Sequence, residues 1–94
     1  MLLRRITTAI LFMATTAVAA GNEELWKQAA EYFDTGQYQQ AIGNYHQLLE
    51  RNFKNPQIYY NLGNAYFKAG DLGYAIWSYR KALRLNPGFA QALA

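Results

Sequence analysis

The stretch from Tyr59 to Pro87 reads YYNLGNAYFKAGDLGYAIWSYRKALRLNP, and its pattern repeats an earlier part of the chain. Residues of the earlier unit return with the same identity 34 positions later: Tyr32, Phe33, Gly36, Ala41, Ile42, Tyr45, Leu49 and Asn52 recur as Tyr66, Phe67, Gly70, Ala75, Ile76, Tyr79, Leu83 and Asn86. A fixed period of this length indicates a solenoid, in which one supersecondary unit stacks on the next.

Each unit is predicted to be a pair of α-helices, because apolar residues recur at helical spacing. The first helix of each unit carries Leu25, Ala29 and Tyr32, then Tyr59, Leu62, Gly63 and Tyr66. The second helix carries Ala41, Ile42, Tyr45, Leu48 and Leu49, then Ala75, Ile76, Tyr79, Ala82 and Leu83. The sequence therefore predicts an all-α fold.

Capping residues predict where the helices begin and end. Asn22, Asn55 and Asp71 are predicted N-caps, and Pro56 suits the first helical position. Gly36 and Gly70 are predicted left-handed stops. Helices are therefore expected near residues 23–35, 38–52, 56–69 and 72–85.

These residues resemble the tetratricopeptide repeat (TPR) family, whose period is also 34 residues. The positions that match are the eighth, eleventh, twentieth and twenty-fourth of each unit, with a closing proline: Ala29 or Gly63, Tyr32 or Tyr66, Ala41 or Ala75, Tyr45 or Tyr79, and Pro87. The first unit departs from the family at Gln28 and Phe53, where Leu and Pro are usual. The resemblance implies a right-handed solenoid of TPR helix-turn-helix hairpins. Its two full repeats cover residues 22–55 and 56–89, and residues 90–94 begin a third repeat or a capping helix.

Residues 1–20 are predicted to be a signal peptide. Arg4 and Arg5 precede an apolar run from Ile6 to Val18, and small residues follow at Ala19 and Ala20, which is the order of an export signal. The run is shorter than the roughly 20 residues that a membrane-spanning helix needs. We therefore expect cleavage after Ala19 or Ala20 and an exported protein of the periplasm or cell envelope. The alternative is a membrane anchor retained through an uncleaved signal.

Charge and composition exclude several function classes. The chain has nine Lys and Arg against six Asp and Glu, but two of the basic residues lie in the predicted signal and the others form no basic run. Nucleic acid is therefore not an expected partner. The chain has no cysteine, which excludes a disulfide framework, a Cys-based zinc site and a thiol nucleophile.

Enzymatic chemistry has no recognisable participants in the sequence. His46 is the single histidine and is expected to be a solvated residue on the outer face of its helix. Gly63, Gly70 and Gly73 match neither common phosphate-loop spacing, and no two carboxylates are placed as a general acid and base. We expect a protein that is not an enzyme and that needs no metal or other cofactor.

The TPR resemblance places a partner-binding surface on the first helix of each unit. In TPR arrays these helices line a concave groove, and the matching positions are Glu23, Trp26, Ala30, Phe33 and Asp34, then Gln57, Tyr60, Asn64, Phe67 and Lys68. The predicted contact residues on this concave face are Trp26, Ala30, Gln57, Tyr60, Asn61, Asn64, Phe67 and Lys68. Aromatic anchors beside amide and charged side chains are typical of protein-binding surfaces.

Two qualifications apply to this surface. A core assignment fits Phe33 and Phe67 equally well, whereas Asn64 is the stronger candidate, because a carboxamide can both donate to and accept from an extended peptide backbone. TPR domains that clamp chaperone C-termini resemble one another in a Lys and an Asn at the positions of Trp26 and Ala30. This subtype is therefore not expected.

A narrower resemblance covers most of the chain after the predicted signal. The stretch from Tyr59 to Pro87, preceded by a looser repeat, is similar to the TPR proteins of bacterial aerotolerance operons, the BatE type. That family is exported or membrane-associated and is encoded beside von Willebrand A-domain membrane proteins and a MoxR-type ATPase. The resemblance implies an adaptor or scaffold in a cell-envelope complex, with von Willebrand A-domain proteins as candidate partners.

Two further interpretations stay open. BatE-type proteins generally continue into further segments, so the sequence also fits a fragment of a larger membrane-associated TPR protein. A structural self-association module is the other alternative, because Ile76, Tyr79 and Leu83 need a following repeat, a capping helix or a copy of the chain to cover them.

Overall fold

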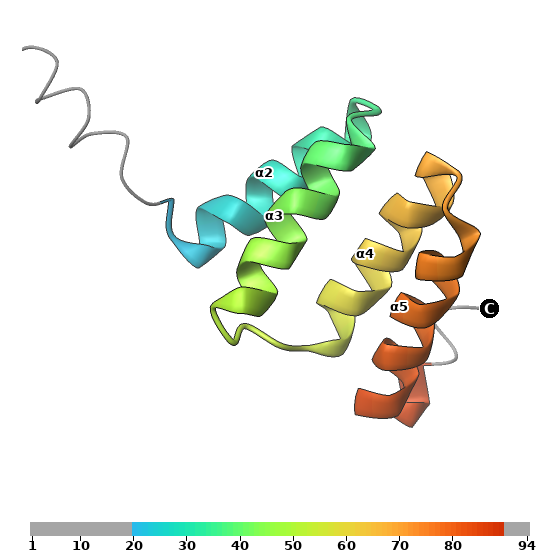
Figure 1. Ribbon diagram of the computed structural model, residues 1–94. Helices are drawn as coiled ribbons and strands as arrows, with labels where there is room; N and C mark the ends of the chain where they lie inside the picture. The colour runs from blue at the N-terminus through green and yellow to red at the C-terminus, as the bar shows by residue number, and fades with distance from the viewer. Residues whose placement is uncertain (1–19, 90–94) are drawn as a thin grey trace, which may run out of the picture.

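The computed structural model describes residues 20–89, which form four α-helices and one 3-10 helix. The helices are α2 (Asn22–Asp34), α3 (Tyr38–Glu50), α4 (Pro56–Ala69), α5 (Leu72–Leu85) and η1 (Pro87–Phe89). Figure 1 shows two hairpins, α2 with α3 and α4 with α5, placed so that α3 lies beside α4. The predicted all-α hairpins are therefore confirmed for this part of the chain. The third unit at residues 90–94 and the signal peptide, apart from Ala20, lie outside the described residues.

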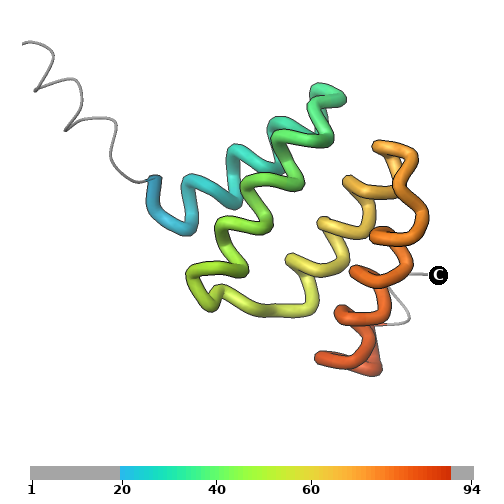
Figure 2. The backbone as a smooth tube through the Cα atoms, in the orientation of Figure 1, coloured from blue at the N-terminus to red at the C-terminus, as the bar shows by residue number. Residues whose placement is uncertain are grey.

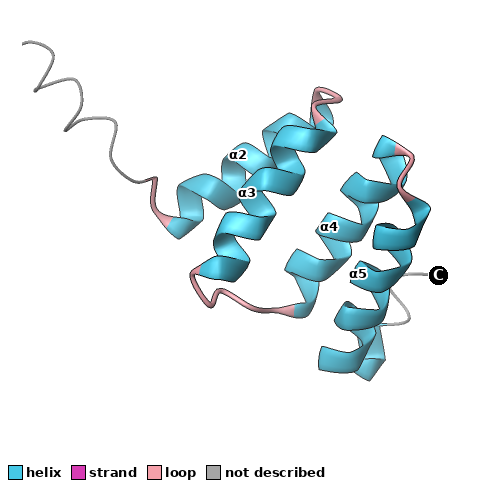
Figure 3. Cartoon of the chain, in the orientation of Figure 1, coloured by secondary structure: helices cyan, strands magenta, loops and turns pink. Residues whose placement is uncertain are grey.

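Most of the predicted helix ends are confirmed by the capping geometry. The Asn55 side chain accepts a hydrogen bond from the Ile58 amide at 2.9 Å, and Asp71 accepts one from the Tyr74 amide at 3.3 Å. Both contacts satisfy amide groups that have no partner within the first turn of a helix. Gly36 and Gly70 adopt φ angles of +78° and +88°, the left-handed conformation that lets a chain leave a helix. Figure 3 shows the short loops that result.

Three predicted ends in the first hairpin are wrong, and one of them is the end of α2, which lies at Asp34 rather than residue 35. Gly21, not Asn22, is the N-cap of α2, because the Leu25 amide donates to the Gly21 carbonyl at 3.0 Å and the helix begins one residue earlier. The Asn22 side chain instead accepts from Arg51 Nη1 at 3.3 Å. Helix α3 ends at Glu50 rather than residue 52, and Asn52 takes the left-handed conformation with φ of 61°.

The core joins the first hairpin to α4. Its buried members are Leu25, Ala29, Ala41, Ile42, Tyr45, Leu48, Ile58, Leu62 and Ala65. The small residues lie where helices approach closely, and a Cβ atom added to Gly63 would lie 2.5 Å from the Tyr79 ring. Figure 2 shows how the α4 backbone runs between α3 and α5. Helix α4 therefore buries two faces, one against each neighbour.

The last α-helix is covered on one side only. Ala75, Ser78 and Ala82 of α5 are buried. The predicted exposure of its opposite side is confirmed at Ile76, whereas Tyr79 and Leu83 are half-buried. Among residues 20–89, no segment lies against the Ile76 side chain as α4 lies against α3.

Candidate functional site: two equivalent pockets along α2 and α4

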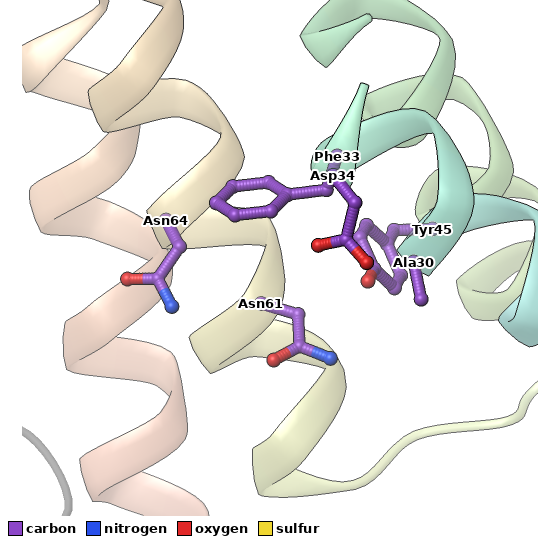
Figure 4. Close-up of a pocket in the computed structure, with 6 residues that line it drawn as sticks. All are labelled: Ala30, Phe33, Asp34, Tyr45, Asn61 and Asn64. Carbon is purple, nitrogen blue, oxygen red and sulfur yellow. The ribbon is translucent and has the colours of Figure 1, made fainter. Parts of the chain in front are cut away.

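A pocket of about 140 Å³ opens between the first hairpin and α4. Its lining residues are Ala30, Phe33, Asp34, Tyr45, Asn61 and Asn64. In Figure 4 the Phe33 ring extends toward α4, the Asp34 carboxylate lies beside Tyr45, and the two asparagine side chains come from α4 on the opposite side. The pocket thus combines an aromatic wall with one carboxylate and two amides. Such a mixture can orient a polar or cationic group beside an apolar one.

Tyr45 lies mostly in the core, and its phenol reaches the pocket. Burial raises the pKa of Tyr45 above its ordinary value of 10.0, the nearby Asn61 side chain acts in the opposite direction, and the Asp34 charge raises the pKa further. The phenol is therefore neutral across the physiological range. It offers a hydroxyl rather than a negative charge to a ligand.

A second pocket of about 430 Å³ opens along α4 and α5. It is lined by Tyr60, Asn64, Phe67, Lys68 and Tyr79. The repeat period maps these residues onto Trp26, Ala30, Phe33, Asp34 and Tyr45, of which all except Trp26 line the first pocket. The two pockets are thus lined largely by equivalent positions of the two repeats. The charge is inverted, since Asp34 of the first pocket becomes Lys68 in the second.

Asn64 lines both pockets and is held in place by α5. The Tyr79 hydroxyl donates to Asn64 Oδ1 at 2.5 Å. This bond occupies part of the acceptor capacity of the side chain and leaves its Nδ2 group to donate. A fixed amide donor between two pockets suits a peptide carbonyl. Asn64 was expected both to donate to and to accept from a peptide backbone, and the bond from Tyr79 favours the donor role.

The structure brings together six of the eight predicted contact residues. Ala30, Tyr60, Asn61, Asn64, Phe67 and Lys68 line the two pockets. Phe67 is 55% exposed, so the alternative core assignment is wrong for this residue, whereas Phe33 is half-buried and belongs to both core and pocket. Gln57 lines neither pocket and donates to Asn61 Oδ1 at 2.8 Å. The part that these residues play in binding stays a prediction.

Trp26 lies apart from the two equivalent pockets. It packs edge-on against Tyr45 and Phe53, with ring centroids 6.0 and 6.3 Å apart. It borders a separate hollow of about 420 Å³ with Glu23 and other residues near the start of α2. Phe53, at the position where the TPR resemblance leads one to expect a proline, lines this hollow together with Trp26.

Two residues of the pockets were not predicted from the sequence. Tyr45 and Tyr79 were expected to be core residues, because they fall on the apolar stripe of the second helix in each unit. Their rings do pack against neighbouring helices, and their outer ends reach the pockets. The polar end of a tyrosine on an apolar stripe is the signal that could have found them, since a buried hydroxyl usually requires a partner.

His46 is not the solvated residue that the sequence predicts. It is half-buried, and its Nε2 atom lies 2.8 Å from the Tyr66 hydroxyl. The reason is the packing of α4 on α3, which covers the helix face that carries His46. Within residues 20–89, no group of three or more His, Cys, Asp or Glu side chains could hold a metal ion. None of the helices in this range has the length and apolar composition that a membrane span requires.

Comparison with known families agrees with the paired hairpins. The family model described as "TPR repeat" matches residues 29–70, and the one described as "Tetratricopeptide repeat" matches residues 56–89. The chain contains tetratricopeptide repeats. TPR domains generally bind other proteins or peptides, and most of the residues that line the two equivalent pockets come from helices α2 and α4.

Curated relatives share the TPR region rather than their full length. The chain is 39% identical over 61 residues to "Photosystem I assembly protein Ycf3" of Acaryochloris marina, which covers 62% of this chain and 37% of that protein. It is 38% identical over 64 residues to "Serine/threonine-protein phosphatase 5" of Homo sapiens and of Rattus norvegicus, which covers 68% of this chain and 13% of each of those proteins. The TPR chain thus spans a minor part of each relative.

Proposed function

We propose that the chain is an exported TPR module that binds an extended segment of another protein in the groove formed by the two equivalent pockets. The role is one of binding rather than catalysis. The observation that supports this role is that equivalent residues line a pocket in each repeat. Neighbouring pockets on successive repeats suit an extended peptide better than a single small ligand.

The charges of the pockets indicate the ligand. Asp34 beside Phe33 and Tyr45 suits a Lys or Arg side chain, whose apolar stem can lie on the rings while its charge meets the carboxylate. Lys68 beside Tyr60 and Phe67 suits an Asp or Glu side chain. The expected ligand is therefore an extended peptide with a basic residue and, a few residues away, an acidic one.

The cellular setting of the proposal rests on the sequence. The predicted signal peptide and the resemblance to BatE-type proteins favour an adaptor or scaffold in a bacterial cell-envelope complex, with von Willebrand A-domain envelope proteins as candidate partners. Cell fractionation tests the location, and capture of A-domain proteins from envelope extracts tests the complex. If the chain remains in the cytoplasm, the envelope role is wrong while the peptide groove is still open to test.

A peptide array tests the groove directly. Peptides that carry a base and an acid at varied spacing are probed with the full chain and with two charge-reversal variants, Asp34→Lys and Lys68→Asp. We expect Asp34→Lys to weaken peptide binding about tenfold by repelling the basic residue, and Lys68→Asp to weaken it about tenfold by repelling the acidic residue. Asn64→Ala should weaken all peptides, while Gln47→Ala on the exposed side of α3 serves as the control. Equal binding by Asn64→Ala and the unmodified chain would contradict the groove.

Self-association is the alternative that one observation favours. Ile76 and Trp77 of α5 are exposed, and apolar residues exposed together tend to find a partner or a copy. Light scattering of the full chain separates the two functions. A monomer at micromolar concentration supports the adaptor, and a concentration-dependent dimer supports self-association.

A further inference from the structure

The outer face of α5 differs from the equivalent face of α3 chiefly in being uncovered. Ile42 of α3 is 7% exposed because α4 packs on it, whereas its repeat equivalent Ile76 is 53% exposed. Leu72 and Leu83 lie on the same side of α5, at i−4 and i+7 from Ile76, and Tyr79 lies beside them. We call Leu72, Ile76, Tyr79 and Leu83 the α5 ridge. The repeat equivalents of Ile76, Tyr79 and Leu83 are Ile42, Tyr45 and Leu49 of α3, which lie in or against the core that joins α3 to α4.

The helix that covers α3 shows what such a ridge binds. Helix α4 presents Ile58, Leu62 and Ala65 to the core of the first hairpin, and all three are fully buried. They lie at i, i+4 and i+7 and form one apolar row on α4. Tyr66 follows at the edge of this row and bonds His46.

Helix α2 has a different surface at the equivalent positions. Ile58, Leu62 and Ala65 are replaced there by Glu24, Gln28 and Glu31, which are exposed or half-buried. A second copy that placed α2 on the α5 ridge would bury two carboxylates against aliphatic side chains. Burial of unpaired charge is unfavourable, so head-to-tail pairing of copies is disfavoured.

Basic side chains flank the α5 ridge. Arg80 and Arg84 are both exposed, Arg80 one residue beyond Tyr79 and Arg84 eight residues beyond Ile76, and α5 contains no acidic residue. Two α5 helices packed face to face would bring arginines together, which disfavours a symmetric dimer through this face. Arg80 also takes the place of His46, which bonds the covering helix in the first hairpin. A guanidinium there is best matched by a carboxylate on the covering helix.

The second pocket is missing the wall that the covering helix supplies to the first. In the first pocket, Asn61 and Asn64 of α4 close the side opposite Phe33 and Asp34 (Figure 4). The second pocket has the equivalents of Ala30, Phe33, Asp34 and Tyr45, but within residues 20–89 its lining includes no residue from a following helix, and it measures about 430 Å³ against about 140 Å³. A helix on the α5 ridge would stand where α4 stands for the first pocket.

We propose that the α5 ridge is a docking site for an amphipathic helix of a partner protein, with an aliphatic row at i, i+4 and i+7 and acidic residues along the flank that meets Arg80 and Arg84. The docked helix also closes the second pocket. The α5 ridge adjoins the peptide groove, since Tyr79 belongs to the ridge and also lines the second pocket.

A synthetic helix of matching chemistry tests the proposal. The probe is a fluorescein-labelled peptide of about 20 residues, long enough to hold helical structure. It carries the Ile, Leu, Ala, Tyr pattern of residues 58, 62, 65 and 66, with Glu along the flank. Control peptides carry Lys along the flank, or Glu, Gln and Glu in place of the aliphatic row as in α2. Fluorescence anisotropy with the full chain should show binding of the Glu-flanked probe, with the controls at least about tenfold weaker.

Variants of the chain test whether the probe binds at the α5 ridge. Ile76→Ser should weaken the probe by about tenfold, and circular dichroism should show unchanged helicity because Ile76 is exposed. Tyr74→Ala is the matched control, since Tyr74 is similarly exposed on α5 but stacks on Tyr66 away from the ridge. Arg80→Glu combined with Arg84→Glu should reverse the preference between Glu-flanked and Lys-flanked probes. Gln47→Ala, on the exposed side of α3, should leave probe binding unchanged.

Three results would overturn the proposal. Equal probe binding by Ile76→Ser and the unmodified chain would place the probe elsewhere. Dimerisation of the chain that Ile76→Ser abolishes, without probe binding, would make a second copy the occupant. Probe binding that occurs only after deletion of residues 90–94 would make those residues the occupant.

Discussion

The imidazole Nε2 atom of His46 lies 2.8 Å from the hydroxyl oxygen of Tyr66, and this contact joins α3 to α4. The Tyr66 ring also stacks on Tyr74 of α5, with centroids 5.2 Å apart and planes inclined by 23°. One tyrosine therefore contacts both helices that flank α4. The contact is a polar link between hairpins whose other contacts are largely apolar.

A double-mutant cycle should reveal coupling between these two residues. His46→Ala and Tyr66→Phe each remove one partner of the hydrogen bond, and the double variant removes both. Because the pair is half-buried, we expect a coupling free energy of about 0.5–1.5 kcal/mol. Urea unfolding of the four proteins measures it, and strictly additive effects would show that the contact contributes nothing to stability.

Gly63→Ala should destabilise the protein, whereas Gly43→Ala should stabilise it. A Cβ atom at Gly63 would lie 2.5 Å from the Tyr79 ring, while one at Gly43 would meet nothing within 4 Å. Overpacking costs about 1–3 kcal/mol, and the gain in helix propensity from Gly to Ala is only about 1 kcal/mol. Melting temperatures of the two variants should therefore move in opposite directions. Movement in the same direction would refute the close contact at Gly63.

Ala41→Leu and Ala75→Leu should each lower the stability. The two alanines occupy equivalent positions on α3 and α5 and are 0% and 1% exposed. A larger side chain at either position must push the paired helices apart, at a cost of about 1–3 kcal/mol. Thermal unfolding checks this prediction, and an unchanged melting temperature for both variants is the result that the packing does not allow.

Stability should fall as the pH rises above 10. Burial is the main cause that raises the pKa of Tyr45, Tyr66 and Tyr79 above 10.0, so the folded state favours the neutral phenols. Their contribution is fully present below the pKa of the unfolded chain and is lost as the pH rises through the folded values. Urea unfolding between pH 8 and the alkaline limit of folding follows this loss. Tyr45→Phe should reduce the pH dependence, because it removes one of the three phenols.

The exported form should begin at Ala20 or Gly21. The prediction rests on the charged, apolar and small segments of residues 1–20. Intact-mass measurement of the protein recovered from the envelope decides it. Recovery of a membrane-bound form that retains Met1 would support the uncleaved anchor instead.

Local signals made the helices predictable. The repeat period and the capping residues Asn55, Asp71, Gly36 and Gly70 act within a few positions of the helix ends that they determine, so the second hairpin was predicted with its observed bounds. The mapping of groove positions onto α2 and α4 likewise found most residues of the two pockets.

Contacts between distant parts of the chain were not predictable in the same way. The Asn22 side chain is held by Arg51, 29 residues away, and no local pattern indicates that contact. His46 is drawn inward by α4, although its repeat equivalent Arg80 is exposed, so the environment of this position depends on what packs beside the helix. The rings of Tyr45 and Tyr79 pack against neighbouring helices while their outer edges reach the pockets, so neither residue belongs only to the core or only to the surface.

The inversion of charge between Asp34 and Lys68 gives the groove a polarity. The two pockets have equivalent Phe and Tyr side chains but opposite charges, so in the proposed groove a partner segment with one basic and one acidic residue would fit in a single N-to-C direction. The parts of the partner on either side of that segment would then leave the groove at fixed ends, one toward α2 and the other toward α5. A module of this kind would determine which way round its partner is mounted, in addition to holding it.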